Sequence, residues 1–174
     1  MKTKNMAYIA LFAVIICICS WISIPMTVPF TLQTFAIFCA LLILGGKNGT
    51  IAIILYVLMG MVGLPVFSGF RSGVAALAGP TGGYIIGFVL CGAVYWLFEK
   101  SKITRWVLLA VGNVICYLFG TFWFVHVYIT GGKEVTFGAA LMMCVVPYIV
   151  PDIVKLVLAN VVSGKIKKAI MLHV

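Results

Sequence analysis

Two charged side chains, Asp152 and Lys155, interrupt the apolar run GAALMMCVVPYIVPDIVKLVLANVV near the end of the sequence. Residues three apart on a helix share a face, so the carboxylate and the ammonium are expected to lie side by side. A charge at mid-bilayer costs about 2.5–3.5 kcal/mol even on lenient insertion scales, so such residues usually face a cavity and pair. The two groups could grip a small polar substrate, or they could be a structural ion pair that only locks the helices together.

Two prolines, Pro147 and Pro151, precede this pair on the same run. Proline removes a backbone hydrogen bond and loosens a helix. Loosened helices at membrane depth are tolerated mainly where they line a cavity. The prolines therefore favour a substrate site over a purely structural ion pair.

A second candidate site begins at the motif GPTGGY, which contains Thr81, Gly82, Gly83 and Tyr84 and opens another apolar run. Proline fits the first turn of a helix, and the free N–H groups there favour an anion. Arg71 lies in the preceding loop, so these residues could hold a carboxylate. The glycines have a second explanation, because glycines spaced four apart also form close-packing seams between helices.

That packing explanation is favoured for the small residues of the next apolar run, Gly112, Cys116 and Gly120. The glycine motif lacks the Lys-Ser or Lys-Thr of a P-loop and the preceding strand of a dinucleotide site. We therefore expect no cofactor in this chain. The six cysteines and His126 have no ligand spacing, so we expect no metal site either.

The composition indicates a membrane protein. Of 174 residues, 64% are hydrophobic and 9% are charged, and the mean hydropathy is +1.25, far from the average of soluble domains. The net charge of +9 comes from basic residues at the ends of apolar runs rather than in a stripe, which argues against a nucleic-acid partner. The expected environment is the lipid bilayer.

Six spans are predicted in a single integral membrane domain covering residues 1–174, at about residues 6–24, 32–45, 48–64, 81–98, 104–124 and 139–163. Lys and Arg collect in short cytoplasmic loops. With the N-terminus inside, the inner loops hold nine basic residues, including Lys2 and Lys47, and the outer loops hold only Arg71 and Lys133. Both termini are therefore expected to be cytoplasmic. The long apolar loop of residues 64–80 is expected to cap a site that opens to the outside.

Four sequence blocks resemble those of a known family. They are VPFTLQTF at 28–35, GLPVF at 63–67, GPTGGY followed by Gly87-Phe88, and PDIVK at 151–155. In this order and spacing they are similar to the BioY family, the biotin-specific substrate-binding subunits (S components) of energy-coupling factor (ECF) transporters. The resemblance spans nearly the whole chain and implies an all-α membrane protein, a compact six-helix bundle in a prokaryotic plasma membrane.

The resemblance also implies a function that is not enzymatic. Such a chain captures biotin on the outside and works with a transmembrane coupling (T) subunit and two cytoplasmic ATPases, which use ATP. Asp152 and Lys155 would contact the ureido ring of biotin, and Arg71 with the 81–84 helix start would face its carboxylate. The expected wall of the site is formed by the rings of Phe67, Phe70, Tyr84 or Tyr148. Gln33 and Asn113 could add hydrogen bonds to the ligand, or they could equally bond helix to helix.

The family docks its coupling subunit through an Ala-x-x-x-Ala pattern on the first helix, which this sequence lacks. Ala13 and Cys17 preserve a small-x-x-x-small pair there, so we expect Ala10, Ala13 and Cys17 to form the docking face. Three alternatives to biotin uptake remain open: an S component for another vitamin, a membrane-embedded enzyme, and a structural or assembly protein.

Overall fold

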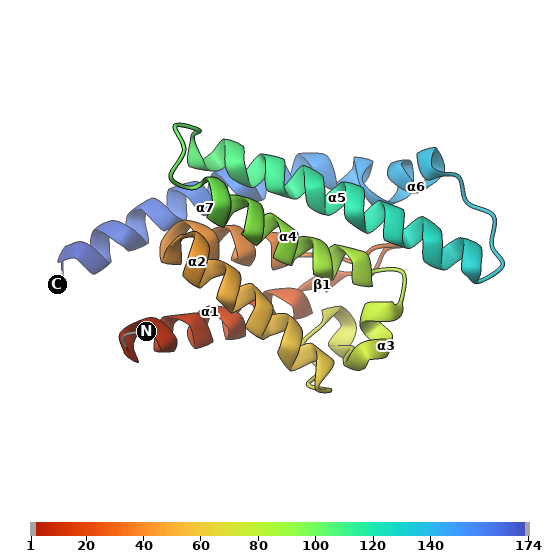
Figure 1. Ribbon diagram of the computed structural model, residues 1–174, viewed down its shortest axis with the longest axis horizontal. Helices are drawn as coiled ribbons and strands as arrows, with labels where there is room; N and C mark the ends of the chain where they lie inside the picture. Colours follow the sequence, from red (N-terminus) through yellow and green to blue (C-terminus); the bar gives the residue numbers. More distant parts are fainter. Residues whose placement is uncertain (1–2, 173–174) are drawn as a thin grey trace.

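The computed structural model describes residues 3–172, with side chains through residue 168. Lys2, which was counted among the inner basic residues, lies outside this range. The chain is almost entirely helical (Figure 1). Its helices are α1 (Thr3–Trp21), α2 (Gln33–Met61), α3 (Gly73–Ala78), α4 (Gly82–Phe98), α5 (Arg105–Thr130), α6 (Phe137–Cys144) and α7 (Val146–Leu172), with a short 3-10 helix, η1 (Ser68–Phe70).

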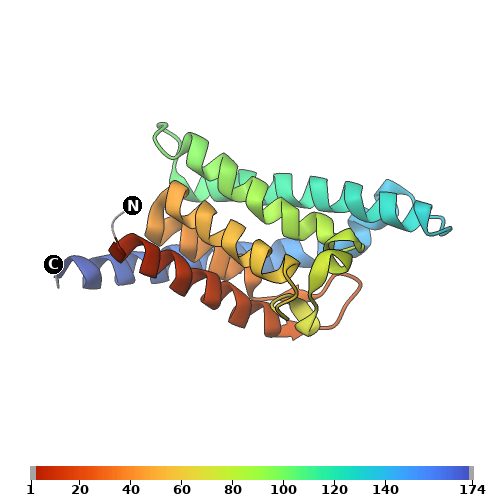
Figure 2. The same ribbon diagram turned by 60° about the horizontal axis from the view of Figure 1, so that its bottom comes forward.

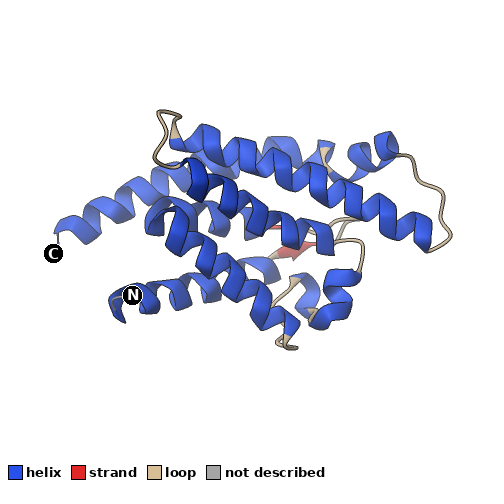
Figure 3. Ribbon diagram, in the orientation of Figure 1, coloured by secondary structure: helices blue, strands red, loops and turns tan. Residues whose placement is uncertain are grey.

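Among the described residues, α1, α2, α5 and α7 are each long and apolar enough to cross a membrane, and α4 is a shorter apolar helix. The exception to the helical structure is a two-residue antiparallel pair between α1 and α2 (Figure 3). It joins β1 (Ser23–Ile24) to β2 (Phe30–Thr31), with Ser23 opposite Thr31. The chain is an all-α membrane protein that passes the bilayer several times, as the composition predicted.

Helix α2 is a hairpin of two helical halves. Gly45 has φ 80° and ψ 168°, a conformation that only glycine adopts readily. Gln33 and Tyr56 are 23 residues apart, which corresponds to about 35 Å along a straight helix, yet their side chains are hydrogen-bonded at 2.7 Å. The chain therefore reverses at Gly45, which lies in the glycine cluster that separated two segments in the sequence.

Close contact between α4 and α5 depends on small residues. A Cβ atom at Gly87 would lie 2.7 Å from the Cys116 sulfur, and one at Gly112 would lie 2.8 Å from the Cys91 sulfur. A Cβ at Gly120 would fall within the Tyr84 ring, at 2.2 Å. The packing explanation for the small residues of α5 is confirmed.

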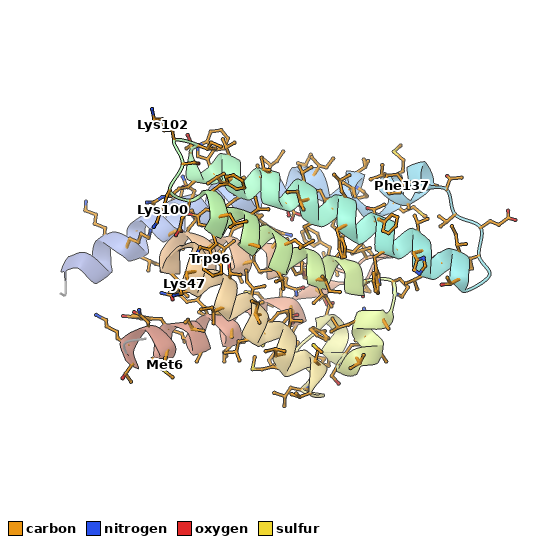
Figure 4. All side chains as sticks on the ribbon, viewed as in Figure 1. Met6, Lys47, Trp96, Lys100, Lys102 and Phe137 are labelled. Carbon is orange, nitrogen blue, oxygen red and sulfur yellow. The ribbon has the colours of Figure 1, made fainter. Side chains whose placement is uncertain are left out.

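The two ends of the bundle differ. The first turn of α1 and the last turns of α7 lie at one end, on the left in Figures 1 and 2, and α3, α6 and the β1–β2 pair lie toward the other. Lys47, Lys100 and Lys102 gather at the end with the termini, whereas Phe137 lies at the far end (Figure 4). Basic residues that the sequence assigned to one side of the membrane thus share one end of the bundle.

The segment predicted as one span at 139–163 is interrupted. Helix α6 ends at Cys144, and α7 begins at Val146 after Val145 with φ −124° and ψ −53°. The break directly precedes Pro147, whereas Pro151 is accommodated inside α7. The interruption lies less than two turns from Asp152, so the chain is irregular where the sequence placed a cavity.

Gly46, which follows the reversal point of the α2 hairpin, offers a test of this arrangement. A Cβ at Gly46 would lie 2.4 Å from the Trp96 Cα and 2.8 Å from a Glu99 carboxylate oxygen, which accepts a hydrogen bond from the Gly46 N–H. We expect Gly46→Ala to lower the free energy of unfolding by about 1–3 kcal/mol, measured by thermal unfolding in detergent. Gly164→Ala is the matched control, since a Cβ there has no neighbour within 4 Å. Equal stability of the two variants would contradict the hairpin packing.

Candidate functional site

Asp152 and Lys155 form an ion pair inside the bundle. The Lys155 Nζ lies 2.8 Å from Asp152 Oδ1, and the two residues are only 5% and 6% exposed. Thr34 of α2 connects the two charges, because its hydroxyl donates to Asp152 Oδ1 and accepts from Lys155 Nζ, both at 3.1 Å. The shared helical face that the spacing predicted is therefore confirmed, and α2 supplies a third member.

Two aromatic side chains complete the surroundings of the charges. The Tyr117 hydroxyl of α5 donates to Asp152 Oδ2. The Lys155 ammonium lies 4.2 Å from the centroid of the Phe30 ring, a distance at which a cation is attracted to the ring face. Three separate parts of the chain, at residues 30–34, 117 and 152–155, thus meet at one buried point.

This network leaves hydrogen-bonding capacity on both charges. A carboxylate accepts about four hydrogen bonds, and Asp152 accepts three among the described residues, from Lys155, Thr34 and Tyr117. An ammonium has three donors, and Lys155 directs two at Asp152 and Thr34. A ligand can therefore find one charged acceptor and one charged donor side by side.

The ion pair lines a cavity with about 740 Å³ of empty space, a volume that includes the open solvent at its mouth. The cavity wall comes from the β1–β2 region, the start of α2, the segment before α3, and the helices α3 to α7. Of the predicted substrate-binding residues, the lining includes Asp152, Lys155, Arg71, Thr81, Tyr84, Gln33, Phe67, Asn113 and Tyr148. The structure brings these nine residues to one cavity.

Several lining residues are fixed by bonds on the side away from the charges. The Tyr84 hydroxyl lies 2.9 Å from the Thr121 hydroxyl, and the Tyr148 hydroxyl donates to the Val28 carbonyl. Gln33 donates to the Tyr56 hydroxyl at 2.7 Å, which leaves its carbonyl oxygen facing Thr31 at 3.5 Å. Bonds of this kind hold the rings in place before a ligand arrives.

Three predicted site residues do not line the cavity. A Cβ at Gly82 would lie 1.6 Å from the Leu77 carbonyl oxygen, and one at Gly83 would lie 2.2 Å from the Trp123 Cβ. Both glycines are therefore explained by crowding at the start of α4. The Gly82 and Tyr84 N–H groups donate to the carbonyls of Gly79 and Thr81, so these two groups are not free to bind an anion. Phe70 is 62% exposed and points outward.

The expected docking face on α1 also needs correction. Ala13 and Cys17 are only 1% and 4% exposed, because this side of α1 packs into the bundle. Ala10 is exposed, and Val14, one turn further, is exposed with it. Ala13 and Cys17 therefore cannot contact a partner, and Ala10 is the member of the predicted set that can.

Thr34, Tyr117 and Phe30 were not predicted as site residues. Thr34 adjoins Gln33 at the start of an apolar run, and Tyr117 follows Asn113 by one helical turn, so a search for polar residues within apolar helices would have found both. Phe30 carries no such signal, because its role depends on the position of Lys155 in three dimensions.

This chain is similar to known proteins in sequence and in fold. The sequence model of the BioY family matches residues 1–171. The chain belongs to the BioY family. Among BioY relatives, the biotin transporter BioY of Thermotoga maritima is 40% identical, covering 91% of this chain and 92% of the relative. A probable biotin transporter BioY of Pyrococcus horikoshii is 36% identical, covering 96% and 98%.

Solved structures resemble this BioY chain as well. The crystal structure of an S component for biotin from an ECF-type ABC transporter has a TM-score of 0.83 and 27% identity, covering 96% of this chain and 92% of that one. The S component of a bacterial ECF transporter has a TM-score of 0.58 and 17% identity, covering 96% and 99%, and that likeness extends to the fold alone.

The mutual dependence of the two charges can be measured. Lys155→Met or Asp152→Leu leaves one buried charge without its partner, so each should lower the free energy of unfolding by about 3–5 kcal/mol. The double variant, Asp152→Leu with Lys155→Met, should cost clearly less than the sum, because neither charge remains. Thermal unfolding of all four proteins completes the cycle, with Lys102→Met, which removes an exposed lysine, as the control. Strict additivity would show that the pair is not coupled.

Proposed function

We propose that this chain captures biotin from outside the cell and takes part in its uptake as the S component of an ECF transporter. The observation that carries the proposal is the charged acceptor and donor left open on Asp152 and Lys155 inside a cavity. The names of the BioY relatives and of the similar crystal structure support the choice of ligand.

The ureido ring of biotin matches the ion pair chemically. The ring offers two N–H donors and one carbonyl acceptor. An N–H can donate to Asp152, while the carbonyl accepts from Lys155, and hydrogen bonds to charged partners are about twice as strong as neutral ones. Asn113 and the carbonyl oxygen of Gln33 are further polar groups in the same lining, available for the second N–H.

The remaining parts of biotin match the rest of the lining. The bicyclic body is apolar and would lie among the rings of Phe67, Tyr84 and Tyr148. Arg71 is the lining residue that could pair with the valerate carboxylate, since a guanidinium binds carboxylates with two parallel hydrogen bonds. Binding at both ends would explain why the cavity needs charges on separate elements.

Transport requires partners beyond this chain. In the proposed complex, a transmembrane T subunit and two cytoplasmic ATPases supply the energy of ATP hydrolysis, and the S component itself carries no cofactor. The end with Lys47, Lys100 and Lys102 would face the cytoplasm of a prokaryotic cell, since short cytoplasmic loops are rich in Lys and Arg. The chain would then present its cavity to the outside and act as a binding subunit rather than an enzyme.

Biotin binding by the purified chain tests this proposal. Binding should be saturable, and a nanomolar ligand at micromolar concentration should raise the free energy of unfolding by about 4 kcal/mol. Asp152→Asn and Lys155→Met should each abolish that thermal shift, because each removes a charged partner of the ureido ring. Lys133→Ala, an exposed residue away from the cavity, is the control.

The same assay separates the alternatives. Unchanged biotin affinity in both charge variants would contradict the site. Stabilisation by a different vitamin would indicate another S component specificity, and turnover of a lipid or isoprenoid substrate without partners would indicate an enzyme. Absence of any stabilising ligand would favour an assembly role.

A further inference from the structure

The C-terminal end of α1 is hydrogen-bonded to the segment that carries Arg71. The Ser20 hydroxyl is fully buried and donates to the Val66 carbonyl, 46 residues away in sequence. The Trp21 indole N–H donates to the Pro65 carbonyl at 2.8 Å. Two consecutive side chains of α1 therefore hold two consecutive peptide groups of the segment before η1.

This segment continues into a tight turn that ends at Arg71. The Phe67 N–H donates to the Arg71 carbonyl at 3.0 Å, which closes the turn. Gly69 and Phe70 inside it have φ of 70° and 58°. A phenylalanine rarely adopts positive φ, so this conformation needs support from its surroundings.

Trp21 supplies that support. The Trp21 and Phe70 rings are stacked, with centroids 5.3 Å apart and planes at 27°. On the other side of the turn, Phe67 is buried and contacts Tyr56 of α2 edge to face at 5.6 Å. The turn is thus held between α1 and α2 by an aromatic contact on each side.

The direction of the Arg71 side chain depends on this turn. Its Nε donates to the Ser68 carbonyl within the turn, at 3.2 Å. Among the described residues, the ion pair is that of Lys155 with Asp152, and no carboxylate pairs with the Arg71 guanidinium. The turn, rather than a salt bridge, therefore holds the side chain of Arg71, a residue that lines the cavity.

We propose that Trp21 and Ser20 are positioning residues that set the recognition of the ligand's carboxylate through Arg71. Neither residue lines the cavity, so neither touches the ligand. The inference rests on the proposed function, because it takes biotin as the ligand and its valerate carboxylate as the partner of Arg71. It adds a role for the end of α1, a helix whose side chains otherwise lie outside the site.

The test compares biotin with its neutral carboxamide, which has the same ureido ring and body but no charge for Arg71. Arg71→Gln should weaken biotin binding by about 10- to 100-fold, the range for a hydrogen bond to a charged group. Trp21→Ala should weaken biotin binding by about tenfold and leave carboxamide affinity within about twofold. In the Arg71→Gln background, Trp21→Ala should have no further effect on biotin affinity.

Milder variants keep the test decisive if Trp21→Ala fails to fold. Trp21→Phe keeps a ring to stack on Phe70 but loses the N–H that donates to Pro65. Ser20→Ala removes the hydrogen bond to Val66. Each variant should weaken biotin binding by less than Trp21→Ala does and leave carboxamide affinity unchanged. Trp106→Ala, which removes an exposed tryptophan at the other end of the bundle, should bind both ligands normally.

Equal weakening of biotin and carboxamide by the Trp21 variants would overturn the inference, because it would show general damage to the cavity. Additive effects of Trp21→Ala and Arg71→Gln would overturn it too, since the two residues would then act separately. Both results leave the proposed function intact. Failure of the parent protein to bind biotin would contradict the proposed function and this inference together.

Discussion

The burial of Asp152 with Lys155 is the constraint on which the rest of the molecule depends. Each charge would cost several kcal/mol in an apolar interior if it stood alone. Here the two charges lie 2.8 Å apart and share Thr34, while Tyr117 and Phe30 occupy the remaining sides. The folded chain must deliver all of these groups to one place, and it must leave one acceptor and one donor open for a ligand.

Three local features of the helices bring these groups together. The reversal of α2 at Gly45 brings its first half, with Gln33 and Thr34, beside its second half, with Tyr56. The small residues between α4 and α5 let these helices approach closely, and Tyr117 lies on α5 within the same region. The interruption between α6 and α7 falls just before the turn that carries Asp152. Each of these features positions the backbone and is not itself a ligand-binding side chain, yet the site depends on all three.

The sequence was sufficient to predict the features that follow from local rules. Hydropathy indicated an all-α membrane protein, the three-residue spacing placed Asp152 and Lys155 on one face, and small residues four apart predicted a packing seam on α5, which lies against α4. The sequence predictions failed for residues whose role depends on which face of a helix points into the bundle. Ala13 and Cys17 proved to be buried, and Gly82 and Gly83 lie in close packing contacts outside the cavity lining. Thr34, Tyr117 and Phe30 were missed because their roles arise from contacts between distant segments.

Recognition of a ureido ring by the Asp152 and Lys155 pair can be measured by changing the ring of the ligand rather than the protein. Calorimetric titration would compare desthiobiotin, which keeps the ureido ring but lacks the sulfur, with the ring-opened diamine, which keeps the sulfur but lacks the urea carbonyl. We expect desthiobiotin to bind with an affinity within about tenfold of that of biotin. The diamine should bind more weakly than biotin by a factor of about 10³ or more, because the buried charged groups lose their partner. Binding of the diamine as tightly as biotin would contradict recognition of the ureido ring by this pair.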